Sequence, residues 1–233
     1  MIDRPRSVVI TGVSQGIGRA LMEQFAKQGW QVWGTIRNPS ALSIASLDSE
    51  SRARITLVPL EITDHAACLA IADVIRQPVD VLINSAASFG NLAFHAGDFS
   101  ANQFIETLTI NVVGPTVLAR ALKPRLLKGN NPMIIMMSTG NASISGNTTG
   151  HMLAYRASKS ALNQVVRTLA AEWGPEGITT IALNPGWVRT RMGGEGASLS
   201  PEEAALNIIS FINTANHSQN GNFVNTDRSQ LPW

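Results

Sequence analysis

The sequence predicts a single α/β domain with a doubly wound, mostly parallel sheet of seven strands and helices on both faces. Short β-branched and apolar runs alternate along the chain with segments of helical periodicity, as they do where helices connect parallel strands. A cluster of glycines separates the first strand-like run from the first helical segment. At 233 residues two domains are possible but not required, and we expect residues 1–233 to form one unit.

The composition is that of a globular protein, with 44% hydrophobic and 15% charged residues. The net charge of +2 comes without any run of lysines or arginines that would mark a nucleic-acid or membrane surface. Cys68 is the single cysteine, so no intrachain disulfide is possible and a reducing, cytoplasmic location is expected. Residues 1–7 have the pattern of neither a signal peptide nor a membrane span. The four histidines are widely spaced without partner ligands, so no metal site is predicted.

The first strand is predicted at residues 7–11, a β-branched run that ends at a glycine. Helical spacing follows and continues to Gly29. Glycines between a strand and a helix allow a tight turn and let the helix N-terminus approach a pyrophosphate, which indicates the dinucleotide-binding turn of a Rossmann fold. The expected cofactor contacts of this turn are Gly12, Ser14, Gln15, Gly16, Ile17 and Gly18.

The second strand is predicted at residues 31–36, and Arg37 follows it directly. Near this point an acidic residue binds the adenosine ribose of NAD, whereas an arginine suits the 2′-phosphate of NADP. No Asp or Glu occurs between Glu23 and Asp48. Arg37 therefore favours NADP(H) over NAD(H), the alternative being a solvated cation at a strand end.

The third and fourth strands are predicted at residues 55–60 and 78–83. A short helix with loops is expected before the third strand, and a second helix, with Thr63 or Asp64 as its N-cap, is expected after it. Small residues at 84–87 follow the fourth strand, where they would let a flat ring lie against the backbone.

A long helical region is predicted at residues 100–127, beginning with a capping box of Ser100 and Gln103 and kinking near Gly114. Asn111 lies within it among apolar neighbours, so its side-chain amide needs a buried partner. The residues leave two roles open for Asn111, a tie between the helix and a loop or a catalytic group.

The fifth strand is predicted at residues 133–137 and runs into Ser138 and Thr139, where an open α/β sheet binds ligands. After a polar loop, Tyr155 and Lys159 begin a helix, and their spacing of four residues puts them on one face. A free tyrosine titrates near ~10, and a nearby cation favours its phenolate, so the pair suits proton transfer. Taken alone, this short motif is more often an aromatic residue followed by a solvated lysine.

The sixth strand is predicted at residues 177–183, followed by a turn at Pro185 and Gly186 beside the expected nicotinamide. Thr190 would reach a phosphate or the carboxamide. The glycine-rich segment at residues 187–200 suits a substrate lid.

The C-terminal region begins with a clear helix start at Ser200, which is the expected N-cap, and Pro201 at the first helical position. Residues 221–224 are expected to add the last strand.

Together these segments resemble the motifs of the short-chain dehydrogenase/reductase family in order and spacing, over nearly the whole chain. The matching motifs are Thr11-Gly12-x-x-x-Gly16-Ile17-Gly18, Asn84-Ser85-Ala86-Ala87, Asn111, Ser138-Thr139, Tyr155-x-x-x-Lys159 and Asn184-Pro185-Gly186. Residues 155–163 and 227–233 resemble the C-factor-like carbonyl reductase branch of that family.

The resemblance implies that Tyr155 is the general acid or base, and that Lys159 lowers its pKa and binds the nicotinamide ribose. It also implies that Asn111 holds a water in a proton relay to Lys159. In this family the second serine of a Ser-Ser pair orients the substrate oxygen, which points here to Thr139, with Ser138 as the alternative. Threonine keeps the hydroxyl but has a stiffer rotamer and narrows the pocket.

The sequence departs from the family pattern at Ser85 and Ala87, in a segment usually written Asn-Asn-Ala-Gly, and at Glu61, where an aspartate usually meets the adenine. The remaining cofactor contacts that the resemblance implies are Glu61, Ile62, Asn84, Ala86, Tyr155, Lys159, Pro185, Gly186, Val188 and Thr190.

The function implied is an NADP(H)-dependent oxidoreductase that transfers a hydride between the nicotinamide and a small carbonyl or alcohol substrate. We expect no nucleic-acid or membrane partner, and a homodimer or homotetramer formed through the two long helices. The alternative is a nucleotide-binding signalling or regulatory protein of the same fold with little turnover. The substrate and the direction of reaction have no readable signature in the sequence.

Overall fold

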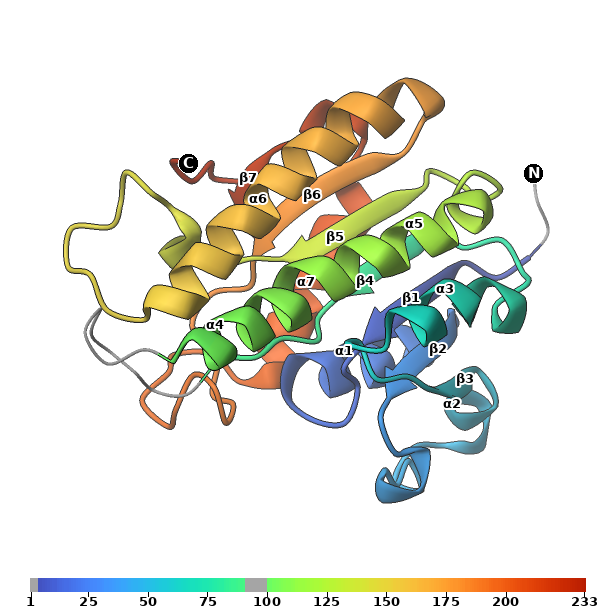
Figure 1. Cartoon of the computed structure of the whole chain (residues 1–233). Helices are drawn as coiled ribbons and strands as arrows, with labels where there is room; N and C mark the ends of the chain where they lie inside the picture. Colours follow the sequence, from blue (N-terminus) through green and yellow to red (C-terminus); the bar gives the residue numbers. More distant parts are fainter. Residues whose placement is uncertain (1–3, 91–99) are drawn as a thin grey trace.

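The computed structural model describes residues 4–90 and 100–233, and its sheet has seven strands in the order β3-β2-β1-β4-β5-β6-β7 (Figure 1). Every neighbouring pair in this sheet is parallel. The predicted doubly wound sheet is thereby confirmed. The strands are β1 (Ser7–Thr11), β2 (Gln31–Ile36), β3 (Ile55–Pro59), β4 (Val81–Asn84), β5 (Met133–Met137), β6 (Thr179–Asn184) and β7 (Phe223–Asn225).

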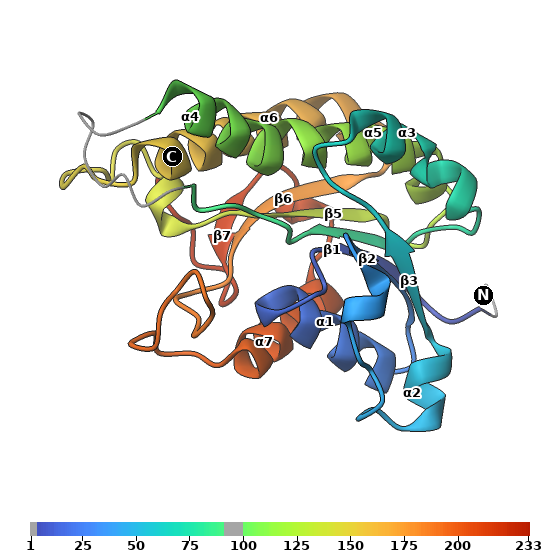
Figure 2. The ribbon, with the colours of Figure 1, turned by 60° about the horizontal axis from the view of Figure 1, so that its bottom comes forward.

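Helices cover both faces of the sheet. Figure 2 shows α3, α4, α5 and α6 on one side and α1, α2 and α7 on the other. Because the chain reverses its direction of winding between β1 and β4, the loops after these two strands diverge at the carboxyl edge, which is where such sheets bind ligands. The helices are α1 (Gly16–Lys27), α2 (Ser49–Ala53), α3 (His65–Val74), α4 (Ala101–Leu108), α5 (Gly114–Leu126), α6 (Leu153–Trp173) and α7 (Pro201–Thr214).

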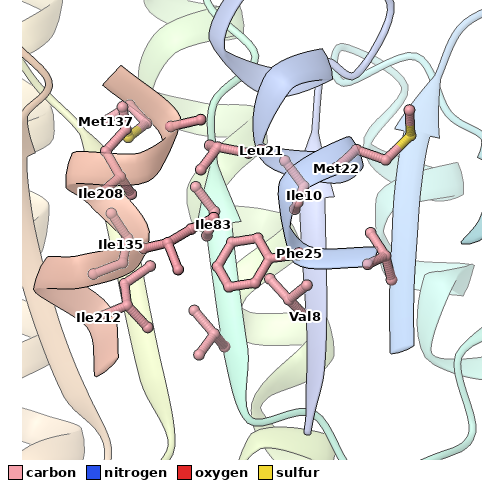
Figure 3. Packing of buried hydrophobic residues seen from close by; sticks show 14 of the residues in the cluster. Val8, Ile10, Leu21, Met22, Phe25, Ile83, Ile135, Met137, Ile208 and Ile212 are labelled. Atoms are coloured by element: carbon pink, nitrogen blue, oxygen red, sulfur yellow. The ribbon is translucent and has the colours of Figure 1, made fainter. Parts of the chain in front are cut away.

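Two apolar cores, one on each face, explain why the central strands are continuous apolar runs. Val8 and Ile10 of β1 belong to the core under α1 and α7, whereas Val9 between them belongs to the core under α3, α5 and α6. Figure 3 shows Phe25 of α1 and Ile208 of α7 packed against strand residues of the first core. Strands buried on both sides alternate between cores rather than between core and solvent.

Helix termini agree with the predictions in part. Ser200 and Glu203 form the reciprocal capping box that starts α7, and Asp64, not Thr63, caps α3 by accepting a hydrogen bond from the Ala67 N–H. The capping box predicted at Ser100 is wrong, because Ser100 precedes α4 without any side-chain capping bond. A capping box needs both side chains to turn back toward the backbone, which residue type alone does not enforce.

The irregularity predicted near Gly114 takes the form of a π-helical turn, Thr109–Val113, between α4 and α5. Gly114 itself packs against the loop after β3, since a Cβ atom added there would lie 2.4 Å from the Ile62 carbonyl oxygen. The glycine therefore allows close approach, and the π-helical turn changes the phase of the helix. Such turns often occur at functional sites.

At the amino edge of the sheet, the buried carboxylate of Asp80 joins three parts of the chain. It accepts hydrogen bonds from the Arg4 guanidinium at 2.7 and 2.9 Å, from the Ser7 N–H at 2.7 Å and from the Asn130 N–H at 2.6 Å. Burial acts to raise the pKa of Asp80, but these hydrogen bonds and the charge of Arg4 outweigh it and hold the pKa below its ordinary value.

Asp80→Asn should lower the free energy of unfolding by about 2–4 kcal/mol, because it removes the charge and turns an amide donor toward groups that are themselves donors. The folded-state pKa of Asp80 is depressed, so its stabilisation is present above the unfolded pKa and is lost as pH falls through the folded pKa. In the variant, the free energy of unfolding should therefore fall less between pH 7 and pH 3 than in the wild type. Chemical denaturation at pH 7 and at pH 3 measures both effects.

Asp73→Asn, at an exposed position on α3, is the matched control and should change stability by less than about 0.5 kcal/mol. Equal stability of the two variants would contradict the importance assigned to Asp80.

Candidate active site

The turn after β1 is closely packed in a way that only glycines permit. Gly12 and Gly16 have φ angles of +75° and +58°. A Cβ atom on Gly18 would lie 2.4 Å from the Gly12 carbonyl oxygen, and one on Gly12 would lie 2.9 Å from the Cα atom of Ala86. The turn therefore brings the start of α1 against the end of β4, with the first N–H groups of α1 at the carboxyl edge of the sheet.

Two other predicted cofactor residues meet this turn. A Cβ atom on Gly16 would lie 3.1 Å from Thr190, which places the start of the segment after β6 against the first turn of α1. Thr11 accepts a hydrogen bond from the Ala86 N–H at 2.9 Å. Asn84 is buried, and its Oδ1 has no hydrogen-bond partner among the described residues. An unpaired buried amide oxygen at this edge fits a site that receives a ligand donor.

At the far side of this edge, Arg37 and Glu61 come together. Arg37 follows β2 and Glu61 follows β3, and because these strands are neighbours the Arg37 Nη1 atom lies 3.9 Å from the Glu61 Oε2 atom. The Arg37 side chain is 79% exposed and open to a ligand. No local pattern in the sequence joins the two residues, and in their ion pair the carboxylate offsets part of the arginine's charge.

Tyr155 and Lys159 lie in the first two turns of α6 and share a face, as predicted. The Lys159 Nζ atom lies 5.9 Å from the centre of the Tyr155 ring and donates a hydrogen bond to the Met137 carbonyl oxygen at 2.7 Å. Both side chains are nearly buried, with exposed fractions of 7% for Tyr155 and 3% for Lys159. The lysine therefore lies below the tyrosine at the end of β5 and is not a solvated surface cation.

The two candidate hydroxyl groups have different partners. Ser138 donates to the Asn163 Oδ1 atom at 2.7 Å, in a buried contact with α6. The Thr139 side chain interacts with the Tyr155 hydroxyl and acts to lower its pKa. The end of β5 thus brings Thr139 to the tyrosine hydroxyl and turns Ser138 away into the protein.

Burial dominates the proton affinities of the pair. Burial raises the pKa of Tyr155 to about 12, and the interaction with Thr139 acts in the opposite direction. Burial also lowers the pKa of Lys159 to about 8. The expected lowering of the Tyr155 pKa is therefore not produced by the protein groups, because desolvation of the phenolate outweighs the stabilising contact. At neutral pH the tyrosine hydroxyl is therefore protonated and the lysine is mostly charged.

Asn111 has the buried partners that its sequence position called for. Its Oδ1 accepts from the Ser88 N–H at 2.8 Å, and its Nδ2 donates to the Ser88 carbonyl oxygen at 2.8 Å and to the Ser158 hydroxyl at 2.9 Å. Both amide hydrogens are used in these contacts, which tie the π-helical turn to the loop after β4 and to α6. Among the described residues, its side chain is hydrogen-bonded to Ser88 and Ser158 and not to Lys159.

Phe89 is a site residue that sequence reasoning missed. Its ring centre lies 4.7 Å from that of Tyr155, with the ring planes inclined by 32°. A single aromatic residue in a loop has no pattern that would have identified it, because the contact joins residues 66 positions apart.

The segment predicted as a substrate lid folds back on itself after Gly186, which has a φ angle of +87°. The Trp187 Nε1–H donates to the Gly193 carbonyl oxygen at 2.8 Å, and Val188 pairs with Leu199 as an isolated bridge. Trp187 is largely exposed. The role of this segment as a lid stays a prediction, as do the contacts of Pro185, Gly186 and Val188 with a cofactor.

Within residues 4–90 and 100–233, no group of three or more His, Cys, Asp or Glu side chains is placed to hold a metal ion. Across the same residues, no helix combines the length and the apolar character needed to cross a membrane.

Comparison with known proteins agrees with this geometry. The sequence model of the short chain dehydrogenase family matches residues 6–198. The C-signal of Myxococcus xanthus is 36% identical over 161 residues, which are 69% of this chain and 96% of that protein. The NADPH-dependent pterin aldehyde reductase of Arabidopsis thaliana is 30% identical over 226 residues, 93% of this chain and 91% of that protein.

Among solved structures, the carbonyl reductase Sniffer of D. melanogaster superimposes with a TM-score of 0.90 and 31% identity, covering 99% of this chain and 100% of that one. The family resemblance inferred from the motifs is confirmed, including its carbonyl reductase branch. The chain therefore belongs to the short-chain dehydrogenase/reductase family of NAD(P)-dependent oxidoreductases.

Proposed function

We propose that this protein is an NADP(H)-dependent carbonyl reductase, in which Tyr155 exchanges a proton with the oxygen of a small carbonyl or alcohol substrate. One observation carries the proposal: Tyr155 is nearly buried, its ring centre lies 5.9 Å from the ammonium group of Lys159, and Thr139 interacts with its hydroxyl. Three such groups at the carboxyl edge of a parallel sheet, beside a glycine turn, form a proton-transfer site next to a dinucleotide.

The residues at this edge fit a dinucleotide. The glycine turn places the first N–H groups of α1 at the carboxyl edge of the sheet, and the Oδ1 atom of Asn84 is unpaired among the described residues. When bound, the dinucleotide supplies or accepts the hydride. The residues proposed to hold it are Gly12, Ser14, Gln15, Gly16, Ile17, Gly18 and Thr190 at the pyrophosphate, Arg37, Glu61 and Ile62 at the adenosine, and Asn84, Ala86, Lys159, Pro185, Gly186 and Val188 toward the nicotinamide.

The protein's own groups complete the reaction. The raised pKa of Tyr155, about 12, keeps the hydroxyl protonated, so it can donate to a carbonyl oxygen that gains negative charge. We assign Thr139 rather than Ser138 as the second donor to that oxygen, because the Ser138 hydroxyl is already donated to Asn163. The charge of Lys159 stabilises the tyrosinate left behind. In the reverse reaction, alcohol oxidation, the tyrosinate acts as the base.

A regulatory protein of the same fold is the second candidate, and the 36% identity to the C-signal protein of M. xanthus is what favours it. The two functions differ in turnover. The regulatory candidate would be favoured if NADPH raises the melting temperature of the protein but no member of a broad panel of aldehydes and ketones is reduced.

Tyr155→Phe should remove carbonyl reduction, with a loss of at least about 100-fold in kcat, because the ring remains and the proton donor is gone. NADPH oxidation followed at 340 nm with an aldehyde panel measures turnover, and fluorescence titration measures NADPH binding. Binding should be retained within about threefold. Turnover retained in the variant would refute the assignment of Tyr155.

Arg37→Ala should weaken NADPH binding by about 10-fold and NADH binding much less, because the exposed guanidinium is proposed to pair with the 2′-phosphate. Glu61→Gln should shift the ratio of the two dissociation constants toward NADPH, since it removes the carboxylate 3.9 Å from Arg37. Arg52→Ala, on the exposed surface of α2, is the control. Equal losses of NADPH and NADH affinity in Arg37→Ala would contradict the 2′-phosphate assignment.

The value of kcat/KM for NADPH should be level at neutral pH and fall as pH rises through about 8, where Lys159 loses its charge. The pKa of this lysine is lowered, so the fall comes below the ordinary lysine range. Lys159→Met should have low activity without this fall. Lys123→Met, which removes a surface ion pair with Glu176, should keep it. A wild-type profile that stays level to pH 10 would contradict the prediction.

A further inference from the structure

The rings of Phe89 and Tyr155 form a tilted pair at the mouth of the proton-transfer site. Their centres are 4.7 Å apart, and Phe89 is half-buried whereas Tyr155 is nearly buried. A separation of this size is within the range of favourable aromatic contacts. Phe89 therefore covers part of the tyrosine ring and still presents part of its own surface outward.

The backbone on both sides of Phe89 is held in place. Asn111 binds both the N–H and the carbonyl oxygen of Ser88, each at 2.8 Å. The Gly90 N–H donates to the Ser88 hydroxyl at 3.1 Å, and Gly90 has a φ angle of +75°. A Cβ atom at Gly90 would lie 2.9 Å from the Thr107 hydroxyl oxygen. The turn that carries Phe89 is thus fixed by hydrogen bonds to Asn111, in the π-helical turn between α4 and α5.

The same amide also reaches the helix that carries the tyrosine. Asn111 donates its second amide hydrogen to the Ser158 hydroxyl at 2.9 Å, and Ser158 donates to the Tyr155 carbonyl oxygen at 2.8 Å. Asn111 is fully buried. One amide therefore sets the positions of both Phe89 and Tyr155, and the spacing of their rings is a built feature of the site.

We propose that Phe89 is a specificity-determining residue that selects carbonyl substrates carrying a flat aromatic group, and that Asn111 is the positioning residue that holds it there. Because the Phe89 ring lies against the Tyr155 ring, we expect the substituent of a carbonyl held at the Tyr155 and Thr139 hydroxyls to lie alongside Phe89. A planar ring can stack or meet the phenylalanine edge to face, whereas a puckered aliphatic ring cannot. This inference rests on the proposed reductase function and adds a substrate class to it.

The test compares benzaldehyde with cyclohexanecarbaldehyde, which match in size and differ in planarity. Because the two aldehydes differ in intrinsic reactivity, the informative quantity is the change in their ratio of kcat/KM between wild type and variant. Phe89→Leu keeps apolar volume and removes the ring, and it should lower the benzaldehyde preference by about 5- to 10-fold, mainly through KM. Phe89→Tyr keeps the ring and should retain the preference.

Asn111→Ala should reduce the same preference, because the turn that carries Phe89 is no longer held. Any loss of kcat should be common to both aldehydes, whereas KM should rise more for benzaldehyde. Ser88→Ala keeps both backbone contacts with Asn111 and should change the ratio by less than about twofold, since only the bond to Gly90 is lost. A merely structural role for Asn111 would lower kcat/KM equally for both aldehydes. An unchanged ratio in Phe89→Leu would overturn the proposal.

A binding experiment separates this inference from the proposed reaction. Acetophenone and cyclohexyl methyl ketone are titrated against Tyr155→Phe in the presence of saturating NADPH, where turnover is blocked. We expect acetophenone to bind more tightly than cyclohexyl methyl ketone, and this difference to disappear when Phe89→Leu is added to Tyr155→Phe. That result supports selection of aromatic substrates even if the wild type reduces no aldehyde. Equal binding of the two ketones overturns it, whatever the outcome of the turnover assays.

Discussion

Asn111 places its side-chain amide in the interior and uses both amide hydrogens and the carbonyl oxygen there. A buried amide left unpaired costs about 1–3 kcal/mol per missing bond, so the three segments it joins are coupled. The π-helical turn sets the direction of this side chain. The loop after β4, the π-helical turn between α4 and α5, and the start of α6 consequently meet in one arrangement, and Phe89 and Tyr155 take their places from it.

The two edges of the sheet use buried charge in opposite ways. At the amino edge, Asp80 is surrounded by donors that hold its pKa below the ordinary value. At the carboxyl edge, Lys159 donates one hydrogen bond within the described part of the chain, to Met137, and burial lowers its pKa to about 8. An incompletely compensated ammonium group lowers stability, and such groups gather at functional sites. The fold is stabilised at one edge and prepared for chemistry at the other.

Convergence at the carboxyl edge follows from the topology. Because all seven strands are parallel and the winding reverses between β1 and β4, the segments after several strands end beside one another. The glycine turn meets Ala86 and Thr190 there, and Arg37 meets Glu61. The candidate site is therefore assembled from short loops on a rigid sheet, which holds its side chains in fixed positions.

Local patterns in the sequence determined the strands, most helices, the glycine turn and the shared face of Tyr155 and Lys159. Those features depend on neighbours within a few residues, through side-chain alternation, helical spacing and backbone conformations open to glycine. Tertiary structure alone decided which hydroxyl meets Tyr155, that Glu61 faces Arg37, and that Asn111 joins Ser88 and Ser158 beneath Phe89. It also left Ser100 without its predicted cap. These contacts join residues far apart in the chain, and only the packed arrangement of helices on the sheet brings them within bonding distance.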